Sequence, residues 1–541
     1  MVLLKKNSVL RWLILIALTI IAYSSALTTE FAIHNDYRAF DIQHYSINIF
    51  DGWHGVLKHM ESMHLMYIGR PLNAILFNFQ QSLIHTIEDF RYARYISLAT
   101  LILISFITYL ELHQKLKYLN VWLLIIAFGI LSIPSANLYV CWISNYVPGS
   151  LNLLLSLFAW LLFDHSIKHT SREVRYFGLF FSYLTLLASC LNYPATALFF
   201  VFIPFVRVVF DKNHWSEVKH NALFALAFLS ITLISYVLIH KLFLFKYFSH
   251  LFGSEFKSYD PVSYKFSFAI NQNLFKLLLE AVTTGFSIYS TNIEKYYLSL
   301  INILIVFISV LIISSLIKVN NFTELSHKEL KERVLIIVAF LAVSLSPILL
   351  TPNGFVAYRI LYVFFIFCFV LTIFAYRTCI NVLRLYFKFD SRRLGSLILV
   401  SFTACTFFTV TAMTQNSRLE YLYFKEQVAN LPRLTDHALQ GAQPINIFVT
   451  LPKRFEPFVN YSLPYDLSYT ATNYSGLMEA VVYMIADQQH IRRDAYRIRV
   501  LNRVYKDNYI PPQDIKKCTN CILIDTTKIK KMPLNFLPSH F

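Results

Sequence analysis

The sequence predicts an all-α, polytopic membrane protein with about eleven transmembrane helices and a small external α/β domain at its C-terminal end. Hydrophobic residues make up 56% of the 541 positions and charged residues only 15%, and the mean hydropathy is +0.51. Soluble domains carry about a quarter charged residues. The composition therefore excludes an ordinary soluble enzyme, and it also excludes a disordered chain, which would be far more polar.

The apolar residues fall into runs that are long enough to cross a bilayer, which takes about 17–25 helical residues. Tight hairpins are expected around Pro134 and Tyr193. The first run follows Lys5, Lys6 and Arg11 as in a signal peptide, but no clear cleavage site comes after it, so we expect a retained signal anchor. The runs lie near residues 9–27, 94–112, 120–138, 146–163, 176–192, 194–210, 220–241, 297–317, 334–350, 359–376 and 394–413.

Lysine and arginine gather in alternate loops, and this pattern predicts the orientation. By the positive-inside rule, such loops face the cytoplasm. The N-terminus is then cytoplasmic and the C-terminus external. The net charge of +17 is largely explained in this way, so nucleic acid is not an expected partner, whereas membrane lipids are. The basic loops are the N-terminus and those near residues 115–117, 168–175, 207–219, 318–333 and 377–393.

Loop size separates the two sides. Residues 1–413 form the predicted transmembrane module, with large external loops at 28–92 and 241–296, and residues 414–541 form the external C-terminal domain. No internal loop exceeds roughly twenty residues, and the sequence has no GxGxxG or Walker A motif. A nucleotide-bound donor would need a cytoplasmic domain, so we expect a substrate that is available outside or in the outer leaflet.

The first external loop holds acids next to a predicted interfacial helix. Asp36 and Asp41 precede a run with apolar residues at helical spacing, and Gly69, Arg70 and Pro71 then open another helix. A short amphipathic helix with such a stripe lies along a membrane surface. The loop is therefore expected to hold a carboxylate at the height of the lipid headgroups.

Three segments resemble a known family. NDYR at 35–38 with GRPLNAIL at 69–76, NLYVCWISNYVPGSLNLLLSLFAWLLF at 137–163 and TPNGFVAYR at 351–359 look like the Gtr-type glucosyltransferases. These are GT-C-fold enzymes that move glucose from a polyprenyl phosphate onto bacterial O-antigen, and the similar layout covers about residues 1–415. The family often shows two adjacent acids, whereas here Asn35 precedes Asp36, and Asp41 is the nearest substitute.

The resemblance implies a hexosyltransferase of the bacterial inner membrane that moves a sugar from a polyprenyl phosphate to a glycan acceptor. It implies no organic cofactor, and it leaves open whether the enzyme uses a divalent metal ion. Asp36 would be the general base and Asp41 a second acid. The alternatives are a helix N-cap or a solvated loop acid for Asp36, and a surface ion pair for Asp41. Arg70, Arg359 and Arg38 would bind the donor phosphate, because a guanidinium forms bidentate hydrogen bonds to phosphate. An interfacial role for Arg359 and an ion pair for Arg70 are the alternatives.

Histidines and cysteines indicate no metal centre. Five histidines of the first external loop lack the usual spacing of metal ligands, so we expect no metal site there. Five cysteines stand alone in or near predicted spans. Cys518 and Cys521 form a close pair in the external region, which favours a local disulfide over a redox centre or half a metal site.

The C-terminal region turns soluble in composition from about residue 444. Strands are expected at 445–450, 496–500 and 522–525 and a helix at 476–489, which together predict a small α/β domain. Its arginines give a basic face that suits an anionic polysaccharide, the membrane surface or solvent alone.

Three other functions are compatible with the sequence. A flippase or transporter for lipid-linked glycans would place charged residues in the middle of its spans, and the predicted spans have none there. An O-antigen polymerase would be expected to concentrate its functional arginines and histidines in a late external loop. A scaffold without catalytic activity is the third alternative.

Overall fold

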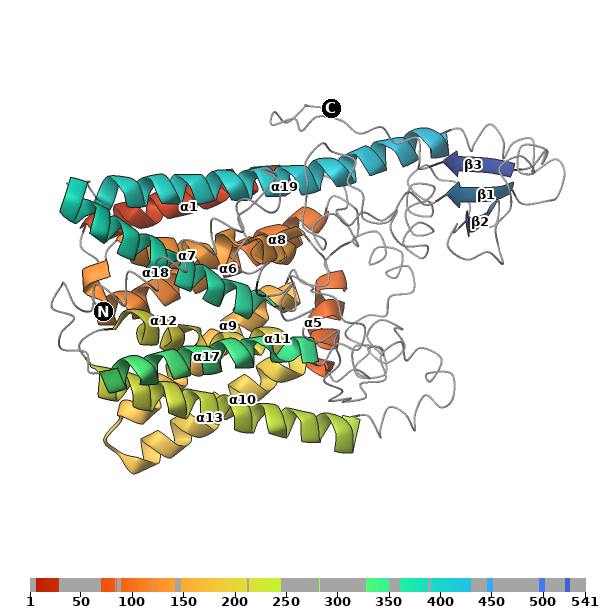
Figure 1. Ribbon diagram of the computed structural model, residues 1–541. Helices are drawn as coiled ribbons and strands as arrows, with labels where there is room; N and C mark the ends of the chain where they lie inside the picture. Colours follow the sequence, from red (N-terminus) through yellow and green to blue (C-terminus); the bar gives the residue numbers. More distant parts are fainter. Residues whose placement is uncertain are drawn as a thin grey trace.

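The computed structural model is a helical bundle with a small sheet (Figure 1). It describes residues 6–28, 70–82, 84, 89–119, 121–141, 147–211, 214–244, 282, 327–349, 361–387, 391–429, 445–450, 496–501 and 521–525. Residues 29–69 of the first external loop, most of the second and most of the C-terminal region lie outside the described residues, as does the predicted span at 297–317.

Helices occupy the other predicted spans. Five described helices are long and apolar enough to cross a membrane, and α7 with α8 forms a sixth if this bent pair is one span. The five are α6 (Phe90–Lys115), α9 (Val147–Lys168), α10 (Arg172–Asn192), α13 (Trp215–Ile239) and the apolar part of α19 (Ser391–Ala429). The multi-pass character is thus supported, while the count of eleven spans stays a prediction.

The remaining helices complete the bundle. Shorter apolar stretches lie in α1, in the run from α11 to α12 and in α18. Short turns of other helix types connect some of these elements. The bounds are α1 (Lys6–Leu27), η3 (Lys117–Leu119), α7 (Val121–Ser132), α8 (Pro134–Cys141), α11 (Pro194–Ala197), η5 (Leu198–Val201), α12 (Phe202–Phe210), η6 (His240–Leu244), α17 (His327–Leu349) and α18 (Tyr362–Phe387).

The core of the bundle lies around α7. Every residue of α7 from Trp122 to Ser132 is buried, as expected for a helix that is apolar on all sides. It approaches α18 so closely that a Cβ at Gly129 would collide with the Phe369 ring. α10 and α13 instead bury one face, and their exposed side chains include large apolar residues such as Phe177 and Ile234. Such faces suit contact with lipid.

The hairpin expected around Pro134 is instead a bend. α7 and α8 meet at 52°, because a proline inside an apolar helix lacks an N–H group and breaks the hydrogen-bond pattern. Side-chain hydroxyls from three other helices bond to the backbone carbonyls at the break: Tyr362 to Ile130, Tyr23 to Leu131 and Thr406 to Ser132. These bonds satisfy groups that would otherwise be costly to bury. The reversal expected at Tyr193 is present, between α10 and α11.

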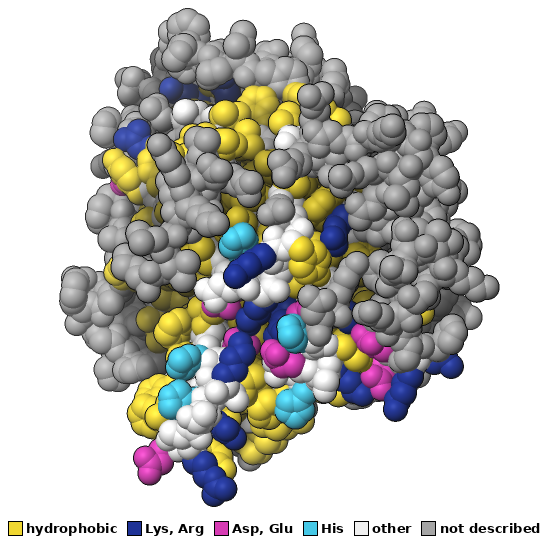
Figure 2. Space-filling model, turned by 90° about the vertical axis from the view of Figure 1, so that its left-hand side faces the viewer, with side chains coloured by type: hydrophobic (Ala, Val, Ile, Leu, Met, Phe, Trp, Pro, Cys, Tyr) yellow, Lys and Arg dark blue, Asp and Glu magenta, His cyan; other side chains and the backbone are white. Residues whose placement is uncertain are grey.

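The basic loops meet at one end of the bundle, as their alternation predicts. We call this the charged end; it is formed by the last turns of α6, α9 and α12 and the first turns of α13 and α17. Figure 2 shows it with Lys and Arg side chains next to Asp and Glu. Ion pairs between Lys115 and Asp164 and between Lys219 and Glu332 join these helix ends. That this end faces the cytoplasm stays a prediction.

A short helix marks the other end. α5 (Pro71–Ser82) stands across the direction of the long helices in Figure 1. It begins directly after Arg70, with a proline at the first helical position, where no N–H group is needed. We call this the α5 end; it is formed by α5, the first turn of α9 and the last turn of α10. The predicted helix after Gly69 and Arg70 is confirmed.

The last long helix continues well beyond its predicted span. α19 has 39 residues, or about 58 Å at 1.5 Å per residue, against about 30 Å for a bilayer core. The predicted boundary at residue 414 therefore falls inside one unbroken helix. In Figure 1, α19 runs beside α1 and extends past the other helices on the side of the three strands.

Three strands lie at the predicted positions in the C-terminal region. β1 (Ile445–Thr450) is central and pairs in parallel with β2 (Tyr496–Leu501) and β3 (Cys521–Asp525). Parallel pairing is typical of α/β folds. The helix predicted at 476–489 lies outside the described residues, so the complete α/β domain stays a prediction.

Candidate functional site

Arg70 lies at the α5 end on an aromatic ring. Its guanidinium carbon is 4.4 Å from the centroid of the Tyr193 ring, a cation–π contact. Among the described residues, neither a carboxylate nor a hydrogen-bond acceptor contacts this guanidinium. A ring holds a cation through its face, so it leaves the positive charge and the in-plane N–H groups of Arg70 available for an anion.

The platform beneath Arg70 is fixed by its own backbone. Tyr193 is 6% exposed and extended, with φ −154° and ψ 98°. Its N–H donates to the Ser189 carbonyl at 2.9 Å, and its carbonyl accepts from Asn152 Nδ2 at 2.8 Å and Thr196 Oγ1 at 3.1 Å. Bonds on both sides of the residue therefore fix its backbone, and burial leaves the ring little room to move.

Amide side chains fasten α5 to the neighbouring helices. Asn73 Nδ2 donates to Asn192 Oδ1 at 2.9 Å, and Asn192 Nδ2 donates to the Pro148 carbonyl at 2.9 Å. At the other end of α5, Gln80 Oε1 accepts from the Val147 N–H at 3.0 Å. This network is uncharged, and it joins α5 to the end of α10 and the start of α9.

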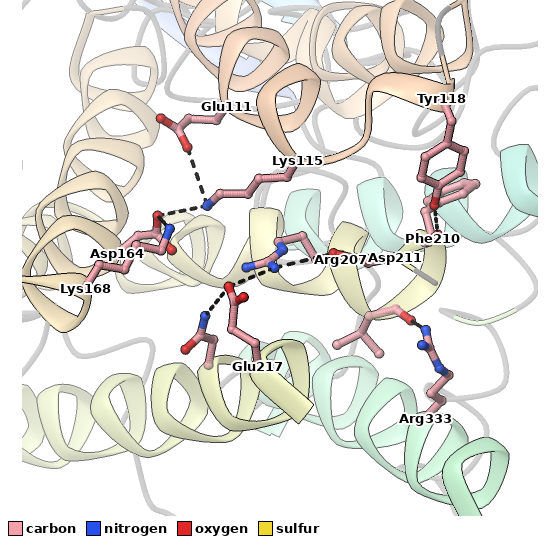
Figure 3. Close-up of polar contacts among 12 residues, drawn as sticks. Glu111, Lys115, Tyr118, Asp164, Lys168, Arg207, Phe210, Asp211, Glu217 and Arg333 are labelled. Atoms are coloured by element: carbon pink, nitrogen blue, oxygen red, sulfur yellow. Dashed lines mark hydrogen bonds and ion pairs between the residues drawn. The ribbon is translucent and has the colours of Figure 1, made fainter. Parts of the chain in front are cut away.

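The charged end contrasts with this arrangement, because carboxylates bind several of its described cations. Lys115 Nζ lies 2.8 Å from Asp164 Oδ2 and 3.6 Å from Glu111 Oε2, and Lys168 Nζ lies 2.5 Å from the same Asp164 oxygen (Figure 3). Asp164 thus joins α6 to α9. Its side chain is 9% exposed, so the pair is shielded from solvent.

A second group of charges joins α12 to its neighbours. Arg207, whose side chain is 4% exposed, donates from Nη2 to Glu217 Oε1 at 3.1 Å and to Asp211 Oδ2 at 3.4 Å (Figure 3). Arg333 donates from Nη1 to the Val208 carbonyl at 2.9 Å and pairs with Glu329 at 3.0 Å. These bonds link α12 to α13 and α17.

Glu332 ties α13 to α17 at the same end. Lys219 Nζ lies 2.8 Å from its carboxylate, and Trp215 Nε1 donates to it at 3.1 Å. These two hydrogen bonds, that from Lys219 first, lower the pKa of Glu332 below its ordinary 4.5. The bonds stabilise the ionised form, and Glu332 is therefore a carboxylate at neutral pH.

Arg377 is the charged-end counterpart of Arg70. Its guanidinium carbon lies 5.5 Å from the Tyr118 ring centroid and 5.9 Å from that of Phe210. The Tyr118 hydroxyl donates to the Phe210 carbonyl. Burial raises the pKa of Tyr118 to about 12, against the opposing effect of Arg377. This contact offers a matched comparison for the one between Arg70 and Tyr193.

Arg94 is a buried cation that sequence reasoning missed. It is the first residue of a predicted span, and in the structure it is fully buried, with Nη1 donating to the Ala26 carbonyl at 3.3 Å. Tyr95 donates to the next carbonyl, of Leu27, at 3.0 Å. Both side chains bond to the unpaired carbonyls at the end of α1, where a positive charge also favours the helix dipole. The signal in the sequence that could have identified Arg94 as a buried cation is its position at the start of an apolar run.

Of the other predicted site residues, only Cys521 lies in the part of the chain that the structure describes. Asp36, Arg38, Asp41 and Arg359 lie outside the described residues, and so does Cys518. Cys521 opens β3, and its disulfide with Cys518 stays a prediction. The described lone cysteines Cys141, Cys190, Cys368 and Cys405 take part in no disulfide. Within the described part of the chain, no group of three metal-binding side chains occurs.

Comparison with protein-family models, characterised proteins and solved structures finds no match.

Proposed function

We propose that this protein is a membrane glycosyltransferase that moves a sugar, with glucose as the first candidate, from a polyprenyl-phosphate donor to a cell-surface glycan such as O-antigen. The reaction takes place on the external face of the bacterial inner membrane. In this proposal the charged end faces the cytoplasm and the α5 end faces outside, as the positive-inside rule predicts.

The observation that carries the proposal is the setting of Arg70. Its guanidinium rests on the Tyr193 ring at 4.4 Å, and no described carboxylate neutralises it. It directly precedes α5, whose N-terminus adds a partial positive charge. An arginine with free N–H groups suits the oxygens of a phosphate. A lipid-linked donor presents its phosphate at the membrane surface, where a helix that lies across the spans would meet it.

The chemistry is a displacement at the anomeric carbon. The acceptor hydroxyl attacks C1 of the donor sugar, the bond from C1 to the phosphate oxygen breaks, and the polyprenyl phosphate leaves with that electron pair. A carboxylate takes the proton of the hydroxyl. Cationic groups stabilise the negative charge that builds on the leaving oxygen.

The sequence supplies the remaining groups. Asp36 is the proposed base and Asp41 its neighbour in the site, while Arg359 and Arg38 join Arg70 at the donor phosphate. Asp36, Arg38 and Asp41 share the first predicted external loop with Arg70, and Arg359 precedes α18. The C-terminal region, with its three strands, is the proposed external domain beside the acceptor.

The test uses the purified protein in lipid nanodiscs with a synthetic polyprenyl-phosphate sugar and a glycan acceptor, against the matching nucleotide sugar. We expect transfer from the lipid-linked donor only. Turnover with the nucleotide sugar alone would overturn the proposal. Transport of the lipid-linked sugar across vesicle membranes without transfer would favour a flippase, and growth of a repeating polymer would favour a polymerase; either result would replace the proposal.

A further inference from the structure

We infer that Tyr193 is a positioning residue for the donor phosphate, which acts by holding the guanidinium of Arg70 on its ring without neutralising it. The inference rests on the proposed function and adds to it a residue that lies far from the predicted loop motif.

The partner of Arg70 is an aromatic ring and not a carboxylate. A carboxylate beside Arg70 would take up its bidentate N–H pairs and cancel its charge, as Glu217 and Asp211 do in part for Arg207 at the charged end. An aromatic face does neither, because it attracts the cation perpendicular to the guanidinium plane. The contact of 4.4 Å between Arg70 and Tyr193 therefore orients a cation that can still bind an anion.

Hydrogen bonds anchor Tyr193 and its neighbour Asn192 to the surrounding helices. Asn192 and Tyr193 are neighbours in sequence, and each holds a different part of the same unit. Asn192 bonds to Asn73 in the first turn of α5 at 2.9 Å, while the Tyr193 ring meets Arg70 just before that turn. Both are anchored on the helices behind them, Asn192 through Pro148 and Tyr193 through Asn152. Arg70 is thus set against a surface that does not need to form when the donor arrives, which lowers the cost of binding.

The ring of Tyr193, and not its hydroxyl, makes the contact with Arg70. The contact is made by the face of the ring, and no described hydrogen bond involves the Tyr193 hydroxyl. A phenylalanine at position 193 should therefore keep the function of the residue, and a leucine of similar volume should lose it.

The test measures steady-state kinetics of the full-length protein with the synthetic polyprenyl-phosphate sugar. We expect Tyr193→Leu to raise the KM for the donor about five- to tenfold with little change in kcat, and Tyr193→Phe to stay near the wild type. In an Arg70→Ala background, Tyr193→Leu should add no further loss. Tyr118→Leu, which removes the ring beneath Arg377 at the charged end, is the matched control and should leave the donor KM unchanged.

A second series covers the case in which Tyr193→Leu does not fold. Phenylalanine analogues with one to three ring fluorines at position 193 keep the shape of the ring and weaken its attraction for a cation stepwise. The donor KM should rise with each fluorine. A flat series, or a loss from Tyr193→Leu that persists undiminished in the Arg70→Ala background, would overturn the inference.

The failure of the inference differs from that of the proposed function. If Arg70→Ala raises the donor KM while the Tyr193 series stays flat, only the inference fails. If Arg70→Ala itself leaves the donor KM unchanged, or the lipid-linked donor is not used at all, the donor site is misplaced and the inference falls with it.

Discussion

The two ends of the bundle hold their cations in different ways. At the charged end, Lys115 and Arg207 bond to carboxylates from their own and neighbouring helices. The side chains of both cations are largely buried. At the α5 end, the side chains that join the helices are uncharged amides such as Asn73 and Asn192, and Arg70 rests on a ring. Lys115 and Arg207 are thus paired with carboxylates inside the bundle, whereas Arg70 has no described carboxylate partner and is ready for an external anion.

Equally basic positions can therefore serve different purposes. A buried ion pair fixes the relative position of two helices and is costly to break, because removing one partner leaves an uncompensated charge. A cation on an aromatic ring contributes less to stability but keeps its capacity for binding. Substitutions at the charged end should therefore change stability, and substitutions at the α5 end should change donor use.

The largest expected effect lies in the external loop that precedes α5. Asp36→Asn should lower the rate of transfer by about 10²–10⁴-fold, because a neutral amide cannot accept the proton of the acceptor hydroxyl. The protein should still fold and insert. The measurement is turnover with the lipid-linked donor, with Asp41→Asn as the comparison. A normal rate in Asp36→Asn with a lost rate in Asp41→Asn would move the base to Asp41.

At the charged end, Asp164→Asn should destabilise the fold by about 3 kcal/mol, because Lys115 then loses its shorter ion pair and keeps only the longer one, to Glu111, as carboxylate contact. The thermal unfolding midpoint in detergent checks this. Glu111→Gln is the matched control, since it removes the weaker, 3.6 Å contact of the same lysine, and it should cost less than about 1 kcal/mol. The donor KM of the folded fraction should not change in either variant. A raised donor KM in Asp164→Asn would contradict the separation of the two ends.

At the α5 end the pattern should be reversed. Arg70→Ala should weaken use of the lipid-linked donor by about ten- to a hundredfold, the effect of losing a charge-assisted bidentate contact of about 1.5–3 kcal/mol. Arg359→Ala should act similarly, and Arg359→Lys should restore only part of the loss, because a point charge cannot reproduce the planar fork. The unfolding midpoint should stay close to that of the wild type. A large drop in stability with unchanged kinetics would make Arg70 a structural residue.

The smallest expected effect is a pH dependence at Glu332. Its pKa is lowered in the folded protein, so its bonds stabilise the fold fully above the ordinary value of 4.5, and the contribution is lost as the pH falls through the lowered pKa. The gap between the unfolding midpoints of the wild type and Glu332→Gln should therefore be constant from pH 7 to about pH 5 and shrink at lower pH. In a Lys219→Met background the gap should be smaller at every pH. A gap that widens on acidification would refute the assignment.

Sequence patterns predicted the features that depend on local composition. Apolar runs located the helices, because a span must bury or expose apolar surface along its whole length. Alternating Lys and Arg predicted which helix ends meet. The proline at position 71 indicated the start of α5, and alternating apolar residues located β1.

The remaining features depend on partners that are distant in the chain. Asn73 and Asn192 are separated by 119 positions, and nothing near Arg70 in the sequence indicates that Tyr193 lies beneath it. The sequence around Pro134 predicts a hairpin and not a bend, because the hydroxyls that satisfy the carbonyls of the bend come from other helices, such as Tyr362 in α18. Pairing between helices is set by packing, which local patterns do not contain.

The proposed reaction requires that the two ends of the bundle face opposite solutions, with the α5 end outside. Thr28 follows α1 at the α5 end and Thr170 lies between α9 and α10 at the charged end, and both are exposed. The measurement is labelling of Thr28→Cys and Thr170→Cys with a membrane-impermeant maleimide, in intact cells and after permeabilisation. We predict that Thr28→Cys is labelled in intact cells and Thr170→Cys only after permeabilisation. Labelling of Thr170→Cys in intact cells, with Thr28→Cys protected, would show the opposite orientation and contradict a donor site on the external face.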